Sequence, residues 1–474
     1  MLASFVAFLD GSVVNLALPA ISRDLGGGLA LQQWVVDGYL LALGALILVA
    51  GAVSDQYGRL VVLRVGLGLF AVASLLCAAA PTGWVLVAAR CLQGLGAAFL
   101  VPSSLAMINA RFTGARQASA IGTWTAWTGT AFVVGPPLGG LLVDALNWRW
   151  VFGLNVLPLA VTLYLTTKLD AGGFGTRRQG AIDVGGAALG AVGLSATVYA
   201  LIEQQRLGFT HPAVVGGLVV GLACLAAFPW WERRAPNPMM PLTLFAERNF
   251  AVGNLVTVFF YAAVSLGTLL VALFLQETVG LSATQAGLAT LPMPVLSFFL
   301  ARPFGILAGR HGPRLYMAVG PMLAATGFLL LALSIPPPHP SGSGDFDFWT
   351  QLLPGLIVFG LGLSITVSPL TAAVLAAVDP AQSGIGSAVN NAVSRISGLI
   401  AVAFMGVIVG GAIDFAGFRR GVLVAAALFV GAGLCAAVGI SNARHDARRV
   451  SAEAAAPCLD RVTPPPALNS VRMQ

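Results

Sequence analysis

Charged residues are scarce in this sequence of 474 residues: only 9% are Asp, Glu, Lys or Arg, whereas 57% are hydrophobic. A water-soluble domain carries roughly 25% charged residues. So few charges cannot cover the surface of a soluble protein of this length, which excludes that class. The apolar residues instead come in blocks of roughly 20, close to the length of a helix that crosses a bilayer. The sequence therefore predicts a membrane protein with many spans in a lipid bilayer.

Cysteine and histidine are scarce as well. The five cysteines include no CxxC pair, and four of them lie in apolar runs, so we expect buried thiols rather than disulfides or metal ligands. The four histidines fall in predicted loops or in the tail. No Walker A sequence and no nucleophile paired with a base is present. We therefore expect no metal, no cofactor and no enzymatic activity.

Lysine is almost absent, since Lys168 stands alone beside 24 arginines, and the formal net charge is +7. The arginines are spread over short loops and the tail, so they indicate membrane topology rather than a nucleic-acid partner. Most Lys and Arg residues fall on one side of the membrane if both termini are cytoplasmic. We therefore expect a multi-pass protein of the bacterial inner (plasma) membrane with both ends in the cytoplasm.

Hydropathy predicts fourteen spans, and all must be helical because a backbone in lipid has to satisfy its own hydrogen bonds. We expect an all-α membrane protein with two six-helix bundles, 1–168 and 249–443, and two linking helices within 169–248. Residues 444–474 are predicted to form a disordered cytoplasmic tail. The first run starts at residue 2 without a preceding basic residue, so either its first turns are missing or the helix is short. The predicted spans are 2–20, 33–53, 60–80, 83–108, 117–143, 149–167, 182–202, 212–231, 250–275, 284–305, 315–335, 350–376, 384–410 and 420–440.

Two stretches of the chain are repeated. GAVSDQYGRL at 51–60 aligns with GILAGRHGPR at 305–314, and QGLGAAFLVPSSLAMI at 93–108 more weakly resembles FGLGLSITVSPLTAAV at 359–374. Internal repetition of this kind is common in secondary transporters. Ionisable residues do not follow the repeat. We therefore place the proton chemistry in the first bundle and expect the second to be an apolar wall.

Six short strings carry a family resemblance. Together they resemble the major facilitator superfamily, in particular its branch of 14-helix drug:proton antiporters. The resemblance implies two six-helix bundles with two extra helices, and secondary transport of small molecules. The loop string departs from the family pattern at Val53, Gln56 and Leu60, which predicts a weaker charge network there. The strings are LDGSVVNLALP (9–19), QQWVVDGYLL (32–41), GAVSDQYGR (51–59), RCLQGLGAA (90–98), GTAFVVGPPLGGLL (129–142) and NWRWVFGLNVLP (147–158).

The resemblance assigns two structural roles. The loop residues would form a latch that holds the two halves together on the cytoplasmic side, unless they are an ordinary solvated loop. The helix 5 string would form a kink that seals the central path and marks an exporter, unless it is a plain packing kink. The latch residues are Gly51, Asp55, Gly58 and Arg59, and the helix 5 residues are Gly129, Gly135, Pro136, Pro137, Gly139 and Gly140.

The charged residues Asp10, Asp37 and Arg90 fall within predicted spans, as do Arg302 and Arg395. A charge near mid-membrane costs at least about 2.5–3.5 kcal/mol and therefore faces a cavity or a partner. Burial would favour the neutral form of either carboxyl and a nearby cation the ionised form, which could couple protons to cargo. A hydrated site remains the alternative for both. Arg90 cannot lose its proton, so it would tune a neighbouring Asp or bind exposed carbonyls.

These residues lead to one main hypothesis: a monomeric exporter of lipophilic or cationic small molecules, such as drugs, antiseptics and antibiotics, in exchange for protons. The alternative is a dedicated exporter of a single metabolite, antibiotic or amino acid, and a membrane sensor or enzyme is more distant. Aromatic side chains could line a cavity for flat cations, or pack and face lipid. The candidates are Trp34, Tyr39, Trp124, Trp127, Phe259, Phe260 and Tyr261.

Overall fold

A computed structural model of the chain describes residues 1–112, 114–168, 183–335, 346–379 and 382–442, and every regular element within these ranges is a helix. Fourteen helical segments of these ranges are long and apolar enough to cross a membrane, which confirms the predicted number of spans. The predicted tail lies outside the described residues.

Two of the spans are each built from two α-helices. One consists of α6 (Arg149–Gly153) and α7 (Val156–Thr167), and another of α11 (Ala283–Ala289) and α12 (Pro292–His311). Proline at the start of α12 lacks the N–H that would continue the α11 hydrogen-bond ladder. The other spans are α1 (Leu2–Leu25), α2 (Gly28–Tyr57), α3 (Arg59–Ala79), α4 (Gly83–Arg111), α5 (Gly114–Ala145), α8 (Val184–Leu207), α9 (Pro212–Glu232), α10 (Arg248–Leu273), α13 (Arg314–Ser334), α14 (Leu353–Ala376), α15 (Ser383–Val409) and α16 (Phe415–Gly439).

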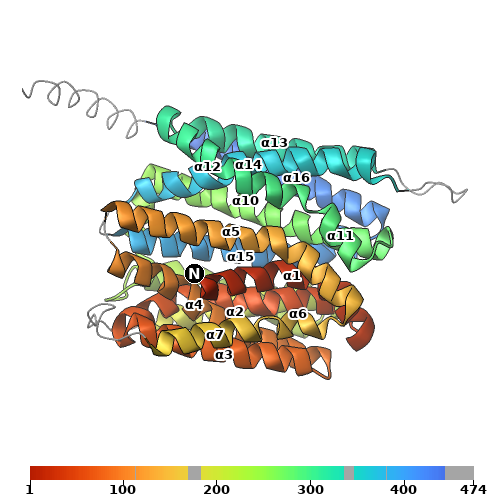
Figure 1. Ribbon diagram of the computed structural model, residues 1–474, viewed down its shortest axis with the longest axis horizontal. Coiled ribbons are helices and arrows are strands. Elements are labelled where there is room, and N and C mark those ends of the chain that lie inside the picture. The colour runs from red at the N-terminus through yellow and green to blue at the C-terminus, as the bar shows by residue number, and fades with distance from the viewer. Residues whose placement is uncertain (113, 169–182, 336–345, 380–381, 443–474) are drawn as a thin grey trace, which may run out of the picture.

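The helices form two bundles (Figure 1), and corresponding helices pack in the same way in both. In the first bundle α4 contacts α2 and α3, and in the second α14 contacts α12 and α13. A Cβ added to Gly94 of α4 would come within 2.3 Å of the Tyr39 carbonyl oxygen on α2, and one added to Gly96 within 2.8 Å of the Phe70 nitrogen on α3. Only glycine permits such close approach.

The second bundle repeats this arrangement with Gly360 and Gly362 of α14. A Cβ on Gly360 would come within 3.0 Å of the Met293 Cα on α12, and one on Gly362 within 2.4 Å of the Ala324 nitrogen on α13. The weaker of the two sequence repeats therefore marks the same close glycine contacts between helices in both bundles.

The stronger repeat marks the turns between successive helices. Gly58 joins α2 to α3 with φ 99°, and Gly312 joins α12 to α13 with φ 87°. Side-chain-bearing residues rarely adopt this positive φ. The paired glycines thus have the same role in each bundle, a turn of one or two residues between two long helices.

The two linking helices do more than connect the bundles. They pack on each other, and α8 also contacts α2 of the first bundle and α15 of the second. The sequence alone suggested no task for these helices beyond joining the halves. The contacts of α8 place it across the seam between them.

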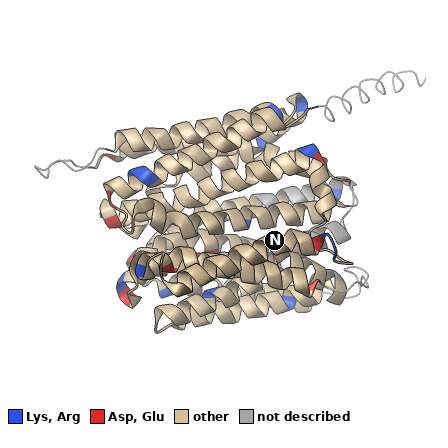
Figure 2. Ribbon diagram, turned by 180° about the vertical axis from the view of Figure 1, so that it is seen from behind, with Lys and Arg blue, Asp and Glu red and all other residues tan. Residues whose placement is uncertain are grey.

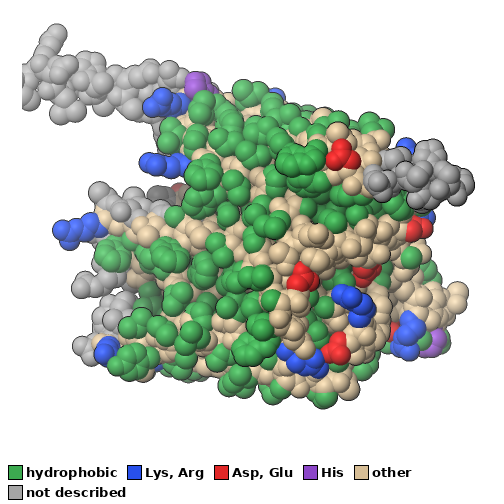
Figure 3. Space-filling model, turned by 45° about the vertical axis from the view of Figure 1, so that its right-hand side comes forward, with side chains coloured by type: hydrophobic (Ala, Val, Ile, Leu, Met, Phe, Trp, Pro, Cys, Tyr) green, Lys and Arg blue, Asp and Glu red, His purple; other side chains and the backbone are tan. Residues whose placement is uncertain are grey.

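The outer surface suits a lipid environment. Most charged residues lie near the ends of the helices (Figure 2), and hydrophobic side chains cover the middle of the face shown in Figure 3. Leu157, Leu333 and Val438 are more than 70% exposed (73%, 74% and 75%). Exposure of many large apolar side chains would be unfavourable in water, so the chain is a multi-pass membrane protein.

Candidate functional site

Asp10 of α1 is buried in a polar network that bonds both of its carboxylate oxygens. Its Oδ2 accepts a hydrogen bond from Arg90 Nη1 at 2.6 Å, and its Oδ1 accepts from Gln93 Nε2 at 2.9 Å and from Asn155 Nδ2 at 2.7 Å. Asp10 and Arg90 are at most 2% exposed. A buried ion pair is tolerated when hydrogen bonds occupy its remaining polar atoms, and both Asp10 oxygens meet that condition.

Arg90 is held from several sides. Its Nε donates to the Val35 carbonyl of α2 at 2.9 Å, and its Cζ lies 4.4 Å from the centre of the Tyr39 ring. Sequence reasoning found the two charges but missed Gln93 and Asn155. Gln93 had a visible signal, because it lies three residues after Arg90, on the same helix face, and is polar within an apolar run.

Asp37 of α2 has the opposite environment. It is fully buried, and neither carboxyl oxygen has a hydrogen-bond partner among the described residues. An ionised carboxylate in such a place would pay a large desolvation penalty without compensation. This arrangement therefore suits a neutral carboxyl, whereas the Asp10 network suits an ionised one.

The neighbours of Asp37 on α2 locate it where three helices meet. One turn earlier, Gln33 Nε2 donates to the Val402 carbonyl of α15 at 2.6 Å, and its Oε1 accepts from Gln205 Nε2 of α8 at 2.6 Å. Trp34 Nε1 donates to Glu203 Oε1 of α8 at 3.0 Å. We call this region of α2, α8 and α15 the three-helix junction, and no residue of α8 in it was identified from the sequence.

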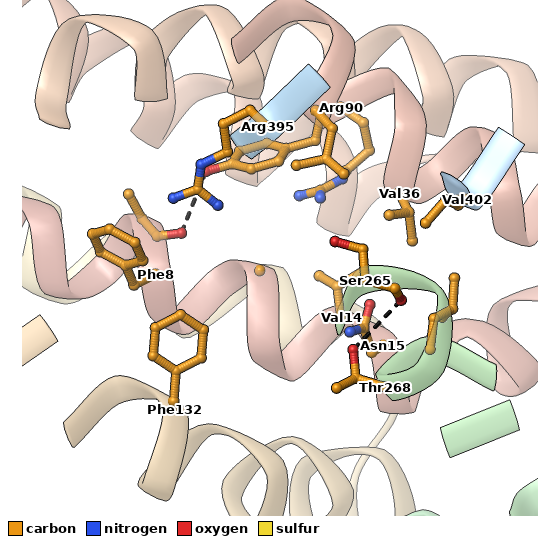
Figure 4. A pocket seen from close by; sticks show the side chains of 15 residues that line it. Phe8, Val14, Asn15, Val36, Arg90, Phe132, Ser265, Thr268, Arg395 and Val402 are labelled. Atoms are coloured by element: carbon orange, nitrogen blue, oxygen red, sulfur yellow. Dashed lines mark hydrogen bonds between the residues drawn. The ribbon is translucent and has the colours of Figure 1, made fainter. Parts of the chain in front are cut away.

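A cavity of about 140 Å³ lies between the bundles, lined by both. Neither Asp10 nor Asp37 lines it, although both had been considered as groups facing a cavity. Its charged lining side chains are Arg90 and Arg395 (Figure 4). Figure 4 shows these two arginines on one side of the cavity, with Phe132 on the other.

One expectation about the cavity was wrong. The second bundle is not an apolar wall, because Arg395 and the hydroxyl-bearing Ser265 and Thr268 line the cavity. Among the aromatic candidates Tyr39 alone lines it, and the other rings there are Phe8 and Phe132. Hydropathy cannot distinguish a ring that faces a cavity from one that faces lipid.

The helix 5 residues pack α5 against helices of both bundles. A Cβ on Gly139 would come within 2.7 Å of Val13 on α1, and one on Gly140 within 2.4 Å of the Ala283 carbonyl oxygen on α11. Gly135 likewise faces α1, and Gly287 of α11 approaches the carbonyl of Pro136, which, like Pro137, lies inside the helix. Among the four glycines of the helix 5 string, only Gly129 is packed loosely.

Asp144, near the end of α5, strengthens the contact with the second bundle. Its carboxylate oxygens accept the backbone N–H groups of Ala283 at 3.2 Å and Thr284 at 2.8 Å. These amides lie at the start of α11, where the first N–H groups of a helix have no acceptor within the helix itself. The helix 5 element and the three-helix junction therefore join the two bundles.

Comparison with known proteins identifies the family. The sequence profile of the Major Facilitator Superfamily matches residues 1–402 and, again, 251–472. The chain belongs to the major facilitator superfamily. It is therefore a membrane transporter and not an enzyme.

Several curated relatives of this transporter are resistance proteins. It is 36% identical over 408 residues to the multidrug resistance protein Stp of Mycobacterium tuberculosis, covering 85% of this chain and 74% of that protein. It is 36% identical over 418 residues to the puromycin resistance protein pur8 of Streptomyces alboniger, with 86% and 80% covered. A methylenomycin A resistance protein of Streptomyces coelicolor is 34% identical over 404 residues, with 85% and 83% covered.

Solved structures agree with the fold of the transporter. A peptide transporter POT in complex with sulfate superposes with a TM-score of 0.66 at 16% identity, covering 92% of each chain. A D-xylose-proton symporter gives a TM-score of 0.64 at 13% identity, covering 94% of this chain and 97% of the other. At these identities the likeness concerns the fold alone.

The latch of this transporter stays a prediction. The side chain of Asp55 lies outside the described part of the chain. Gly58 has the positive φ given above, but a Cβ on Gly51 would have no atom within 4 Å. Close packing therefore does not explain the glycine at position 51.

Gly140→Ala is expected to destabilise the transporter by about 1–3 kcal/mol, the usual cost of overpacking. The new methyl group would meet backbone atoms of α11, which cannot move aside as a side chain can. Gly129→Ala is the matched control, because its methyl group would lie 3.4 Å from a ring atom of Phe298. Thermal unfolding of the purified variants measures the difference, and equal unfolding temperatures would contradict this packing.

Proposed function

We propose that this transporter exports lipophilic small molecules, drugs and antibiotics among them, in exchange for protons. It would do so as a monomer in the bilayer of the bacterial inner membrane, with both termini in the cytoplasm. The positive-inside bias of the arginines supports this orientation. The three-helix junction would then lie near the outer face of the membrane.

The observation that carries the proposal is the buried, unpartnered carboxyl of Asp37 at the seam between the bundles. Alternating access requires α2 of one bundle to separate from α15 of the other. A proton on Asp37 permits closure of the junction, because a neutral carboxyl is far cheaper to bury than a carboxylate. Loss of the proton favours the separated arrangement, in which water reaches the group.

Proton and cargo can then be exchanged through this one equilibrium. A ligand shifts a two-state equilibrium only by its difference in affinity for the two states. Protons would favour the closed junction, and cargo leaving the central cavity would need the separated one. Asp10 would remain the partner of Arg90 in both states.

The test is expression in a bacterial host that lacks its own efflux pumps. We expect tolerance to several chemically unrelated toxins to rise relative to an empty vector, and an uncoupler at sublethal concentration to remove the gain. Unchanged tolerance, or a gain that survives the uncoupler, would contradict the proposal.

A dedicated exporter is the second candidate. The curated relatives include resistance proteins named for single antibiotics as well as one named for multidrug resistance. The same panel of toxins separates the two, because a dedicated exporter would protect against one chemical class only.

A further inference from the structure

The central cavity carries an uncompensated positive charge. Arg90 is neutralised by the ion pair with Asp10. Arg395 of α15 has no ion pair with any described carboxylate, and no acidic residue lines the cavity. A charge without a partner at membrane depth is costly, so its retention needs a compensating group.

Arg395 makes no hydrogen bond within the described part of the chain, and the aromatic ring of Phe8 lies beside it. Its Cζ lies 5.3 Å from the centre of the Phe8 ring, and Phe132 packs beside Phe8 with ring centres 5.7 Å apart. Arg395 is half-buried and also lines the cavity, so its donors can reach a molecule held there. Figure 4 shows its guanidinium near Phe8.

The other polar groups of the cavity suit hydrogen bonding to an uncharged part of a molecule. Asn15 of α1 and Ser265 and Thr268 of α10 line the cavity. The amide and the two hydroxyls can each donate and accept. The cavity thus combines one cation without an ion pair among the described residues, the three aromatic rings of Phe8, Tyr39 and Phe132, and a short polar edge.

We infer that the cargo of this cavity is an aromatic molecule bearing an anionic group, with Arg395 binding the anion and Phe8 and Phe132 contacting the ring. The inference rests on the proposed function and names its substrate class. It runs against the expectation of flat cations, because a cation would face two guanidinium groups and no carboxylate. A planar guanidinium also matches carboxylates and similar oxyanions in geometry.

Three dyes test the inference in proteoliposomes with an imposed pH gradient. Anilinonaphthalene sulfonate and N-phenylnaphthylamine share a ring system, but only the first is an anion, and ethidium is a cation. We expect the wild type to transport the sulfonate in preference to ethidium. Arg395→Gln should raise the KM for the sulfonate by about tenfold or more, the value of a lost charge-assisted hydrogen bond, and leave that for N-phenylnaphthylamine little changed.

Three further variants sharpen the comparison. Arg395→Lys should keep part of the preference, since it retains the charge but not the planar fork. Arg395→Glu should reverse the preference in favour of ethidium. Arg302→Gln is the control, because Arg302 is exposed on α12 and does not line the cavity. Thermal unfolding of each variant establishes that it is folded.

The outcomes separate the two proposals. A wild type that prefers ethidium, or an Arg395→Gln variant with an unchanged KM for the sulfonate, overturns the substrate class but leaves proton-driven export intact. If no dye moves and the resistance test is also negative, the proposed function fails and the inference fails with it.

Discussion

Asp37→Asn is expected to abolish uphill, pH-driven transport while the protein stays folded and still exchanges cargo downhill. Asparagine is close in shape to the neutral carboxyl but cannot gain or lose a proton near neutral pH. Since the carboxyl oxygens of Asp37 have no partners among the described residues, the substitution breaks no hydrogen bond. The junction of this variant should therefore open and close independently of protons, so that cargo alone drives its movement.

Two assays on the same proteoliposomes measure this separation. Uphill transport under an imposed pH gradient should fall to the level of empty liposomes, whereas counterflow of labelled cargo without a gradient should persist. Full uphill transport by Asp37→Asn would remove Asp37 as the coupling group. Loss of both activities, with normal thermal unfolding, would show a role in cargo movement rather than in proton coupling.

Asp347→Asn is the matched control, with the same substitution outside the membrane spans. Hydrogen bonds from the Thr350 hydroxyl and the Trp349 N–H lower the pKa of the Asp347 carboxyl. A lowered pKa means that this group takes up a proton only at more acidic pH than an ordinary aspartate, so it is ionised near neutral pH. Uphill transport by this variant should equal that of the wild type.

Arg90→Met is expected to destabilise the protein by about 3–5 kcal/mol, the usual cost of removing one partner of a buried ion pair. The change would leave the Asp10 carboxylate buried without its counter-charge. It would also remove the bond to the Val35 carbonyl between α4 and α2. Chemical or thermal unfolding of the purified variant measures the loss.

The double variant Asp10→Leu with Arg90→Met should recover much of that stability, because replacing both charges leaves neither unpaired. A double-mutant cycle gives the coupling between the two positions. Simple additivity of the two single changes would contradict a direct pair. If the double variant also retains uphill transport, Asp10 is a positioning residue and the proton is carried elsewhere.

The fold was largely predictable from the sequence. Blocks of apolar residues determined fourteen spans, because hydrophobic length is a local property of the chain. The repeated glycines of α4 and α14 determined how each bundle packs, because a missing side chain allows close approach whatever the wider fold. The six strings also indicated the family that the comparisons confirm.

The site was predictable only as a set of unusual residues. A charge inside an apolar run marks Asp10, Asp37 and Arg90 as costly, but the three look alike in the sequence. Tertiary structure gave Asp10 a partner 80 positions away and left Asp37 without one. Local spacing does not show which helix faces which, so the sequence could not tell that Asp10 is paired and Asp37 is not.

The same reason explains what was missed in the second bundle and the linking helices. The sequence determined the membrane spans, the duplication and the family, because each depends on composition and spacing along a single segment. Only the packing of the helices decided that Arg395 lines the central cavity and that α8 completes the three-helix junction. A cavity or a junction exists between segments, and its chemistry depends on side chains that distant parts of the chain bring together.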